Sequence, residues 1–379
     1  MPRSGRSWGE TRPAPAEPAR EPPIYIMVNR PFFSVLMPTK NRAEILGGAI
    51  ESVLGQSFAD FEIILSDNDD SPTATAEVVA RYGDPRLRYS RTSGRLPMHE
   101  NWENAFLQAQ GQQVLLLEDK MRLVPNALET LHRCVAEHGP LPISYRIKFA
   151  KGERLAGPHG FPAVKRMDSK ATIESFCRFD QDFFQHLPKT LDSCAPRELL
   201  ARVKTASPTG LLFSYISPDY ASGFMLLAAT PEFLHIATPL VYVPNNWMWR
   251  GQYSNGQASY RKTDSYRRFL ASLPVTREDI LKHVPIKSEF LWINSVLYDF
   301  LTLYRRPDHQ PRINWVKYHA FCLVLLLLGR KAGGDLSFEF REIRRSLRQE
   351  GLGFASRVFL DLAGRLAAFV WRLRPGGAQ

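Results

Sequence analysis

The sequence lacks several patterns that would assign a function directly. Its four cysteines, Cys134, Cys177, Cys194 and Cys322, lie far apart and form no CxxC pair. This argues against a zinc site and a disulfide framework, and it fits a reducing compartment. No GxxxxGK[ST] motif occurs, and no GxGxxG follows the first predicted strand. A P-loop ATPase and a dinucleotide-binding Rossmann domain are therefore disfavoured.

Long hydrophobic runs are also missing. The most apolar stretch, Ala320 to Leu328, is about half the roughly 20 residues that a membrane-spanning helix needs. We therefore expect no transmembrane span. Residues 1–23 are rich in Pro, Arg, Glu and Ala and have no long apolar core. They predict a disordered tail rather than a signal peptide, and the chain is expected in the cytoplasm.

The net charge of +11 is distributed unevenly. Residues 305–379 carry 14 Lys and Arg against 6 Asp and Glu, whereas the centre of the chain is nearly balanced. A large nucleic-acid-binding face on the central part is therefore disfavoured, and no nucleic-acid partner is expected.

Two predicted strands end in polar tips. Phe33 to Met37 runs into Pro38-Thr39-Lys40-Asn41-Arg42, and Phe61 to Leu65 runs into Ser66-Asp67-Asn68-Asp69-Asp70. In open α/β sheets, ligands bind beyond the carboxyl ends of the strands. The two tips therefore predict the edge of the sheet at which a ligand binds.

Strand and helix patterns alternate through the first part of the chain, which predicts a largely parallel sheet covered by helices. Further strands are expected at 87–90, 114–117 and 240–243, and helices at 43–56, 71–82, 100–110, 126–137, 173–187 and 217–229. The chain from residue 264 onward is expected to be mostly helical.

Three acidic segments are candidates for chemistry. Asp67 and Asn68 could bind a base or ribose, and the alternative is an ordinary polar loop with an Asp helix cap. Glu118-Asp119 after a buried strand suits a divalent cation that bridges phosphate oxygens, and the alternative is a solvated loop. Asp219, near a predicted helix start, could be a general base or a helix cap.

Taken together, these segments resemble glycosyltransferase family 2, the inverting enzymes of the GT-A fold. Phe33–Arg42 resembles the family's opening strand with its P-T-x-N-R tip, and Ala49–Ser57 its A-I-E-S-V-L-x-Q-S/T helix end. Phe61–Asn68 is similar to the second strand, and Ala76–Arg88 to the segment that follows it. Leu116–Leu128 is similar to the L-D-D-D-D-x-L-x-P-x-A-L segment that holds the metal-binding acids.

The resemblance implies a GT-A-type mixed, mostly parallel sheet flanked by helices, with a mostly helical C-terminal extension. Together with the composition of the two ends, it divides the chain into a Pro/Arg-rich tail (1–30), a glycosyltransferase domain (31–260) and a basic helical region (261–379). The implied reaction moves a sugar from a nucleoside-diphosphate sugar to a glycan, lipid-linked or other hydroxyl acceptor, in polysaccharide or cell-envelope glycoconjugate biosynthesis.

The resemblance also implies residue roles. Asp119 would hold Mn²⁺ or Mg²⁺ against the diphosphate, and Asp219 would deprotonate the acceptor hydroxyl. The residues implied to bind the nucleotide sugar are Pro38, Thr39, Arg42, Asp67, Asn68, Asn101, Glu118 and Lys120.

The acidic motif departs from the family pattern. It reads Glu118-Asp119-Lys120-Met121, so the later acids of the family are replaced. Fewer carboxylates weaken cation binding, and Lys120 could contact a phosphate directly. One alternative is a catalytically inactive pseudo-glycosyltransferase that binds nucleotide or glycan. Another is a nucleotidyltransferase, although Pro38–Arg42 lacks the Gly-rich loop usual in that class.

The C-terminal region combines apolar stretches such as Phe321–Leu328 with a series of arginines. Two interpretations stay open. Basic amphipathic helices bind anionic membrane surfaces, which would place the protein at the inner face of the cell membrane. Alternatively, these helices pack on the catalytic domain and their arginines point into solvent.

Overall fold

The structure of the chain is a computed structural model. It describes residues 30–150, 155–180, 183–214, 216–244, 264–288, 291–331 and 335–372. The predicted N-terminal tail lies outside the described residues, apart from Arg30. Residues 31–379 cluster as one compact unit.

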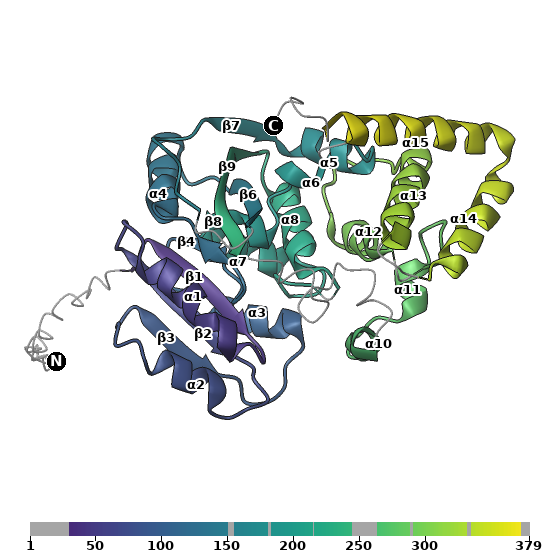
Figure 1. The fold of residues 1–379 in the computed structure, drawn as a ribbon. Coiled ribbons are helices and arrows are strands. Elements are labelled where there is room, and N and C mark those ends of the chain that lie inside the picture. The colour runs from purple at the N-terminus through teal and green to yellow at the C-terminus, as the bar shows by residue number, and fades with distance from the viewer. Residues whose placement is uncertain are drawn as a thin grey trace, which may run out of the picture. The chain divides into compact units, whose positions relative to one another are not determined.

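A nine-stranded mixed sheet forms the centre of this unit (Figure 1). The strand order is β3-β2-β1-β4-β8-β6-β9-β5, and β7 pairs with β9. The first four strands in this order are parallel, whereas β8 is antiparallel to both of its neighbours. The strands are β1 (Phe33–Thr39), β2 (Phe61–Asp67), β3 (Leu87–Arg91), β4 (Gln113–Leu116), β5 (Arg122–Leu123), β6 (Ile143–Ala150), β7 (Val164–Asp168), β8 (Ser193–Pro196) and β9 (Glu232–Pro244).

Helices cover both faces of the sheet because successive side chains of a strand point to opposite faces. Val35 of β1 lies in one core with side chains of α1 and α4, whereas Leu36 lies in another with side chains of α3, α7 and α8. The helices are α1 (Ala43–Leu54), α2 (Ala74–Val79), α3 (Met98–Leu107), α4 (Ala127–His138), α7 (Arg197–Ala206) and α8 (Pro218–Ala229).

The C-terminal helices share a third core with α5 (Ser169–Cys177) and α8. The ring of Phe300 lies 5.1 Å from that of Phe176 and 5.2 Å from that of Phe224. The predicted boundary near residue 260 lies outside the described residues, and this core contains residues from both sides of it. The C-terminal helices are α10 (Asp264–Ala271), α11 (Arg277–Leu281), α12 (Trp292–Leu303), α13 (Trp315–Lys331), α14 (Ser337–Glu350) and α15 (Leu352–Arg372).

The predicted fold class is confirmed, as a mixed sheet flanked by helices with a helical C-terminal region. The single helix expected at 173–187 is wrong in detail. It is divided into α5 and α6 (Phe183–His186), and Phe179 between them has a left-handed φ of 54°. A non-glycine residue in that conformation interrupts the helix.

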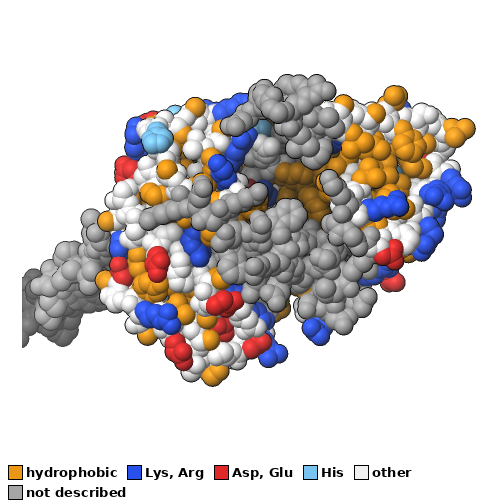
Figure 2. All heavy atoms as spheres, in the orientation of Figure 1, with side chains coloured by type: hydrophobic (Ala, Val, Ile, Leu, Met, Phe, Trp, Pro, Cys, Tyr) orange, Lys and Arg blue, Asp and Glu red, His pale blue; other side chains and the backbone are white. Residues whose placement is uncertain are grey.

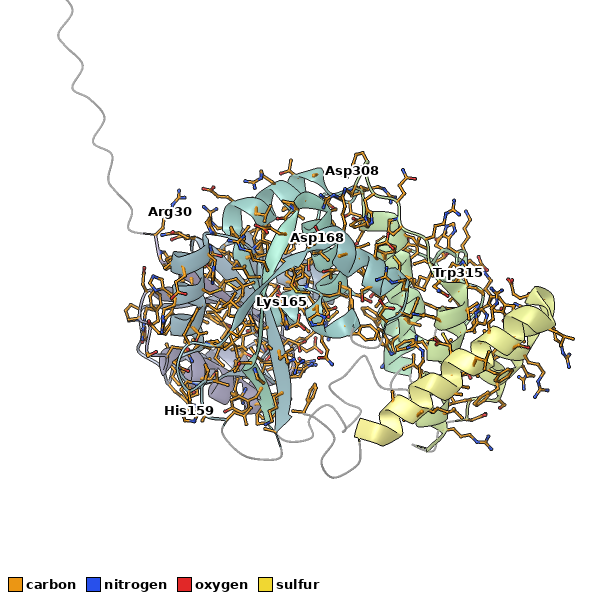
Figure 3. The ribbon with its side chains drawn as sticks, turned by 90° about the horizontal axis from the view of Figure 1, so that it is seen from above. Arg30, His159, Lys165, Asp168, Asp308 and Trp315 are labelled. Atoms are coloured by element: carbon orange, nitrogen blue, oxygen red, sulfur yellow. The ribbon has the colours of Figure 1, made fainter. Side chains whose placement is uncertain are left out.

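Four strands, β5, β6, β7 and β8, were not predicted. In the view from above, Lys165 and Asp168 mark β7, and Trp315 marks the start of α13 (Figure 3). None of the helices within the described ranges is long and apolar enough to cross a membrane. All four cysteines are buried and carry free thiols.

Candidate functional site

The tips of β1 and β2 lie side by side, as their sequence pattern predicts. Thr39 is the register partner of Asp67, and Pro38 that of Ser66. The buried Asn101 side chain of α3 joins the two tips. Its amide donates to the Thr39 carbonyl at 3.3 Å, and its Oδ1 accepts from the Ser66 hydroxyl at 2.7 Å. Asn101 therefore positions the strand ends.

Asp67 and Asn68 are buried and engaged by the protein itself. Asp67 Oδ2 accepts from the Tyr89 hydroxyl at 2.8 Å and from Arg91 Nη1 at 2.9 Å. Asn68 makes two hydrogen bonds with the backbone of Leu96. Both residues thus hold the segment that follows β3 against the tip of β2, and their direct contact with a base stays a prediction.

The acidic motif follows β4 and meets the tip of β1. Both oxygens of the buried Asp119 are engaged, one by the Thr39 hydroxyl and the other by Arg42 Nη1, each at 2.9 Å. Burial raises the pKa of Asp119, and the Arg42 charge opposes this rise. Lys120 Nζ lies 2.7 Å from Glu118 Oε2. The structure thus brings together five predicted site residues from two strand ends.

This arrangement leaves few free oxygens for a divalent cation. Hard cations take oxygen ligands, and Mg²⁺ is usually held by one or two carboxylates together with substrate phosphates. The acids here are already paired with Arg42 and Lys120, so the cluster offers two negative charges that two positive charges balance. Across the residues that the structure describes, no group of three or more His, Cys, Asp and Glu could hold a metal ion.

Asp219 lies in the first turn of α8, after Ser217 and Pro218. The residue is partly exposed. Burial raises the pKa of Asp219 to about 6, Lys189 opposes the rise, and Glu118 adds to it. The charge of Glu118 thus acts on the pKa of the predicted base.

A buried group that sequence reasoning missed surrounds Asp219. Lys189 Nζ lies 2.6 Å from Asp192 Oδ2 and 5.5 Å from the centre of the Tyr220 ring. Asp299 of α12 accepts from the Ser217 N–H at 2.8 Å. Burial raises the pKa of Asp192 to about 7 and that of Asp299 to about 8. These residues determine the charge around the predicted base.

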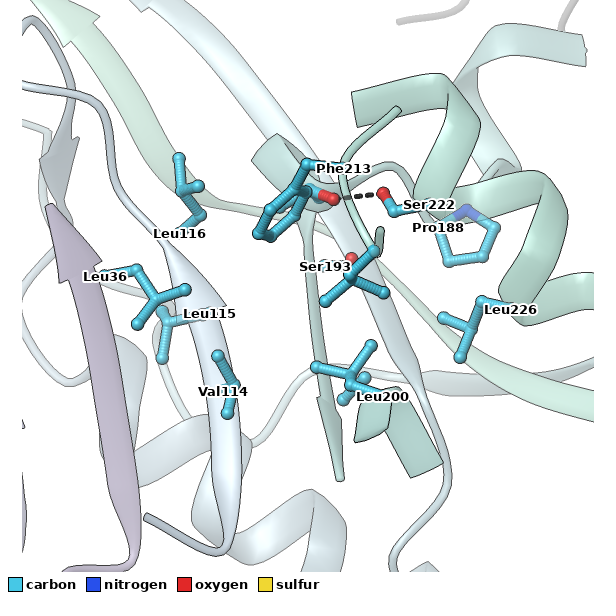
Figure 4. Close-up of a pocket in the computed structure, with 13 residues that line it drawn as sticks. Leu36, Val114, Leu115, Leu116, Pro188, Ser193, Leu200, Phe213, Ser222 and Leu226 are labelled. Carbon is cyan, nitrogen blue, oxygen red and sulfur yellow. Dashed lines mark hydrogen bonds between the residues drawn. The ribbon is translucent and has the colours of Figure 1, made fainter. Parts of the chain in front are cut away.

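No signal in the sequence marked this group. Lys189, Asp192 and Asp299 lie in segments that the notable motifs do not include, and packing alone brings them to the start of α8. The internal pocket in Figure 4 is a different feature. It is lined by apolar side chains such as Leu36 and Leu226, with Ser222 hydrogen-bonded to Thr190, and it contains none of the predicted site residues.

Comparison with known proteins assigns a family to this part of the chain. Residues 34–188 match the sequence model of glycosyl transferase family 2. The matched segment spans β1 to α6 and contains both strand tips and the acidic motif. The chain thus carries a glycosyl transferase family 2 domain, which confirms the resemblance of its motifs.

Two curated relatives are similar over parts of their length. One is the GalNAc(5)-diNAcBac-PP-undecaprenol beta-1,3-glucosyltransferase of Campylobacter jejuni, 31% identical over 166 residues, or 42% of this chain and 53% of that protein. The other is the putative colanic acid biosynthesis glycosyl transferase WcaA of Escherichia coli. It is 31% identical over 103 residues, which are 27% of this chain and 37% of that protein. The chain thus spans about half or less of the length of these relatives.

A solved structure is also similar to this chain. It is that of S. aureus TarS 1–349 in complex with UDP-GlcNAc. The identity is 16% and the TM-score 0.46, and the match covers 65% of this chain and 69% of that one.

Proposed function

We propose that this protein transfers a sugar from a nucleoside-diphosphate sugar to an acceptor hydroxyl, with inversion at the anomeric carbon. The observation that carries the proposal is the position of Asp219. It is a partly exposed carboxylate at a helix start, its pKa is raised to about 6, and it is coupled to Glu118 of the acidic motif. A base whose pKa lies near the working pH is suited to proton transfer.

The reaction is a single displacement. The acceptor oxygen forms a bond to the anomeric carbon while its proton passes to the Asp219 carboxylate. On the opposite side of the sugar, the bond from the anomeric carbon to the diphosphate oxygen breaks, and the nucleoside diphosphate leaves with both electrons. Asp219 then releases its proton to water.

Arg42 and Lys120 supply positive charge where the leaving diphosphate would lie. Both are already close to carboxylates, Arg42 to Asp119 and Lys120 to Glu118. A diphosphate carries more charge than a carboxylate and can take over these donors. We therefore infer that the two side chains neutralise the leaving group, in place of the Mn²⁺ or Mg²⁺ that the resemblance implied.

Thr39 and Asn101 have a supporting role in this proposal. Thr39 donates to Asp119, and Asn101 fixes the Thr39 carbonyl. Together they hold the acidic motif against the tip of β1. These side chains are thereby ordered before a donor binds, which lowers the cost of binding.

The names of two relatives support a proposal for the acceptor. One of them is named for transfer to an undecaprenol-linked glycan and another for colanic acid biosynthesis. We propose a lipid-linked or other glycan acceptor for this chain, in polysaccharide or glycoconjugate assembly, at the cytoplasmic side of a membrane.

A second candidate function is binding of nucleotide or glycan without turnover. The paired state of Glu118 and Asp119 favours it, because both family acids are engaged by cations of the chain itself. The two functions differ in whether Asp219 has a task, since a binding protein needs no base.

A donor-hydrolysis screen separates the two candidates. UDP-, GDP- and dTDP-sugars are incubated with the wild type and with Asp219→Asn, and the nucleotide released and the nucleotide bound are both measured. Glycosyl transfer predicts slow hydrolysis of one donor, lost in Asp219→Asn while nucleotide binding is kept. Nucleotide binding with no hydrolysis by either protein would establish the binding function instead.

A further inference from the structure

The last helix of the chain carries apolar side chains on two opposite faces. The inner face of α15 packs on the molecule through Val358, which is fully buried, and through Arg365, which donates to the Phe179 carbonyl at 2.6 Å. The outer face exposes Leu352 (89% exposed) and Leu360 (73%). Packing on the protein explains the inner face and leaves the outer one unexplained.

The outer face forms one continuous stripe. Leu352, Phe359, Ala363 and Leu366 recur at helical spacing, and all are exposed. The one hydroxyl in the stripe, that of Ser356, donates to the Leu352 carbonyl at 3.0 Å. An exposed apolar patch of this kind marks an interaction surface.

A row of arginines lies on the preceding helix. Arg341, Arg344, Arg345 and Arg348 of α14 are exposed and recur at helical spacing, so they share one face. Within the described part of the chain, only Arg345 of this row has an ion-pair partner, Glu342 at 3.0 Å. The four arginines line a shallow groove together with a neighbouring glutamine.

The apolar stripe and the arginine row belong to the same part of the surface. α14 and α15 pack against each other, and α15 also packs against α13. Figure 2 shows hydrophobic side chains gathered over the part formed by these three helices, with Lys and Arg side chains along its edge. Leu327 and Leu328 of α13 add to the exposed apolar area.

We propose that the outer face of α15 and the arginine row of α14 form a docking surface for a bilayer that contains anionic phospholipids. An interfacial helix inserts its apolar face at the boundary between headgroups and acyl chains, while basic residues bind the headgroup phosphates. Both parts are present here on adjacent helices. A second copy of the chain is the less suitable occupant, because a two-fold contact on this face would bring two arginine rows together.

This inference is independent of the catalytic proposal, because none of its residues belongs to the candidate site. If the enzyme does act on a lipid-linked acceptor, the surface would hold the site close to the acceptor. It would do so without a spanning helix.

Vesicle co-sedimentation of the full chain tests the proposal. Vesicles of equal parts phosphatidylglycerol and phosphatidylcholine are compared with vesicles of phosphatidylcholine alone. The test variants are Arg344→Glu with Arg348→Glu, and Leu360→Asp. The matched controls are Arg202→Glu on α7 and Leu107→Asp on α3, which are also exposed residues of each type.

The proposal predicts that the wild type binds the anionic vesicles at least tenfold more strongly than the vesicles of phosphatidylcholine alone. This binding should weaken as the salt concentration is raised. Each arginine near an anionic surface is worth about fivefold in partitioning. The double arginine variant should therefore lose more than tenfold, Leu360→Asp should lose a similar factor, and both controls should bind like the wild type. Circular dichroism confirms that each variant is folded.

Equal binding to the two kinds of vesicle, or test variants that bind like the controls, would overturn the proposal. A dimer that forms without lipid and is abolished by Leu360→Asp would also overturn it, because a second copy would then occupy the surface. Donor hydrolysis measured on the same samples separates this outcome from a failure of the catalytic proposal.

Discussion

Replacing Lys189 by Met should move the acid limb of the pH–rate profile to higher pH. The charge of Lys189 lowers the pKa of Asp219, because it favours the charged carboxylate. Removing it leaves burial and Glu118, both of which raise that pKa. The base is then protonated at a pH where the wild type is active.

The wild-type profile follows from a pKa of about 6 for Asp219. About nine-tenths of the base is then charged at pH 7 and about one-tenth at pH 5, so the rate should fall about tenfold between these values. An adjacent opposite charge lowers a carboxyl pKa by about 1 to 3. Because Asp192 becomes neutral when Lys189 is lost, we expect a net rise near the lower limit, about one pH unit.

The assay is donor hydrolysis from pH 5 to 9, with the nucleoside-diphosphate sugar that the screen identifies. Glu118→Gln is the companion variant, because removing the repulsion from Glu118 should lower the pKa of Asp219 and move the limb to lower pH. Lys170→Met is the control, since Lys170 pairs with Asp308 at the surface and should leave the profile unchanged.

Movement of the limb in the same direction for Lys189→Met and Glu118→Gln would refute this account of Asp219. So would a profile that does not change in either variant. Circular dichroism spectra at each pH exclude unfolding as the cause, since Lys189 also donates to the Phe184 carbonyl.

Three further predictions concern stability and the donor site. The folded protein holds the Asp299 proton more tightly than the unfolded chain does. The free energy of unfolding should therefore fall by roughly 2 to 3 kcal/mol from pH 6 to 9, and much less in Asp299→Asn, as urea titrations can measure. Gly48→Ala should lower the free energy of unfolding by about 1 to 3 kcal/mol, because the added Cβ would lie 2.5 Å from the Arg122 guanidinium. Gly364→Ala is the control and should not lower it, because no atom lies within 4 Å of the Cβ added there. Calorimetric binding of nucleoside diphosphate should be unchanged by EDTA and roughly tenfold weaker in Lys120→Ala; a strict need for Mn²⁺ would contradict the inferred charge neutralisation.

The first half of the sheet could be predicted because its signals are local. In β1, Val35 and Leu36 face different cores, so the strand reads as a continuous apolar run. β6 was missed since its later half carries charged and exposed residues such as Arg146 and Lys148 among the apolar ones. Its partner β9 lies about ninety residues further along the chain, so nothing nearby indicated the pairing.

The residues of the candidate site that belong to a sequence motif could be proposed from the sequence. Asp119 and Asp219 were recognised from residues next to them in sequence. The charge environment could not be predicted in the same way, because Asp299 meets Ser217 across 82 positions and Arg42 meets Asp119 across 77. The pairing of Asp119 with Arg42 appears only in three dimensions.

The stereochemistry of donor hydrolysis tests the central claim most directly, namely that Asp219 activates an acceptor for a single displacement. Proton NMR identifies the anomer released first, before the free sugar equilibrates. From a donor with an α-linked sugar, the account predicts release of the β-anomer, at a rate that Asp219→Asn abolishes. Release of the α-anomer, or unchanged release by Asp219→Asn, would contradict it.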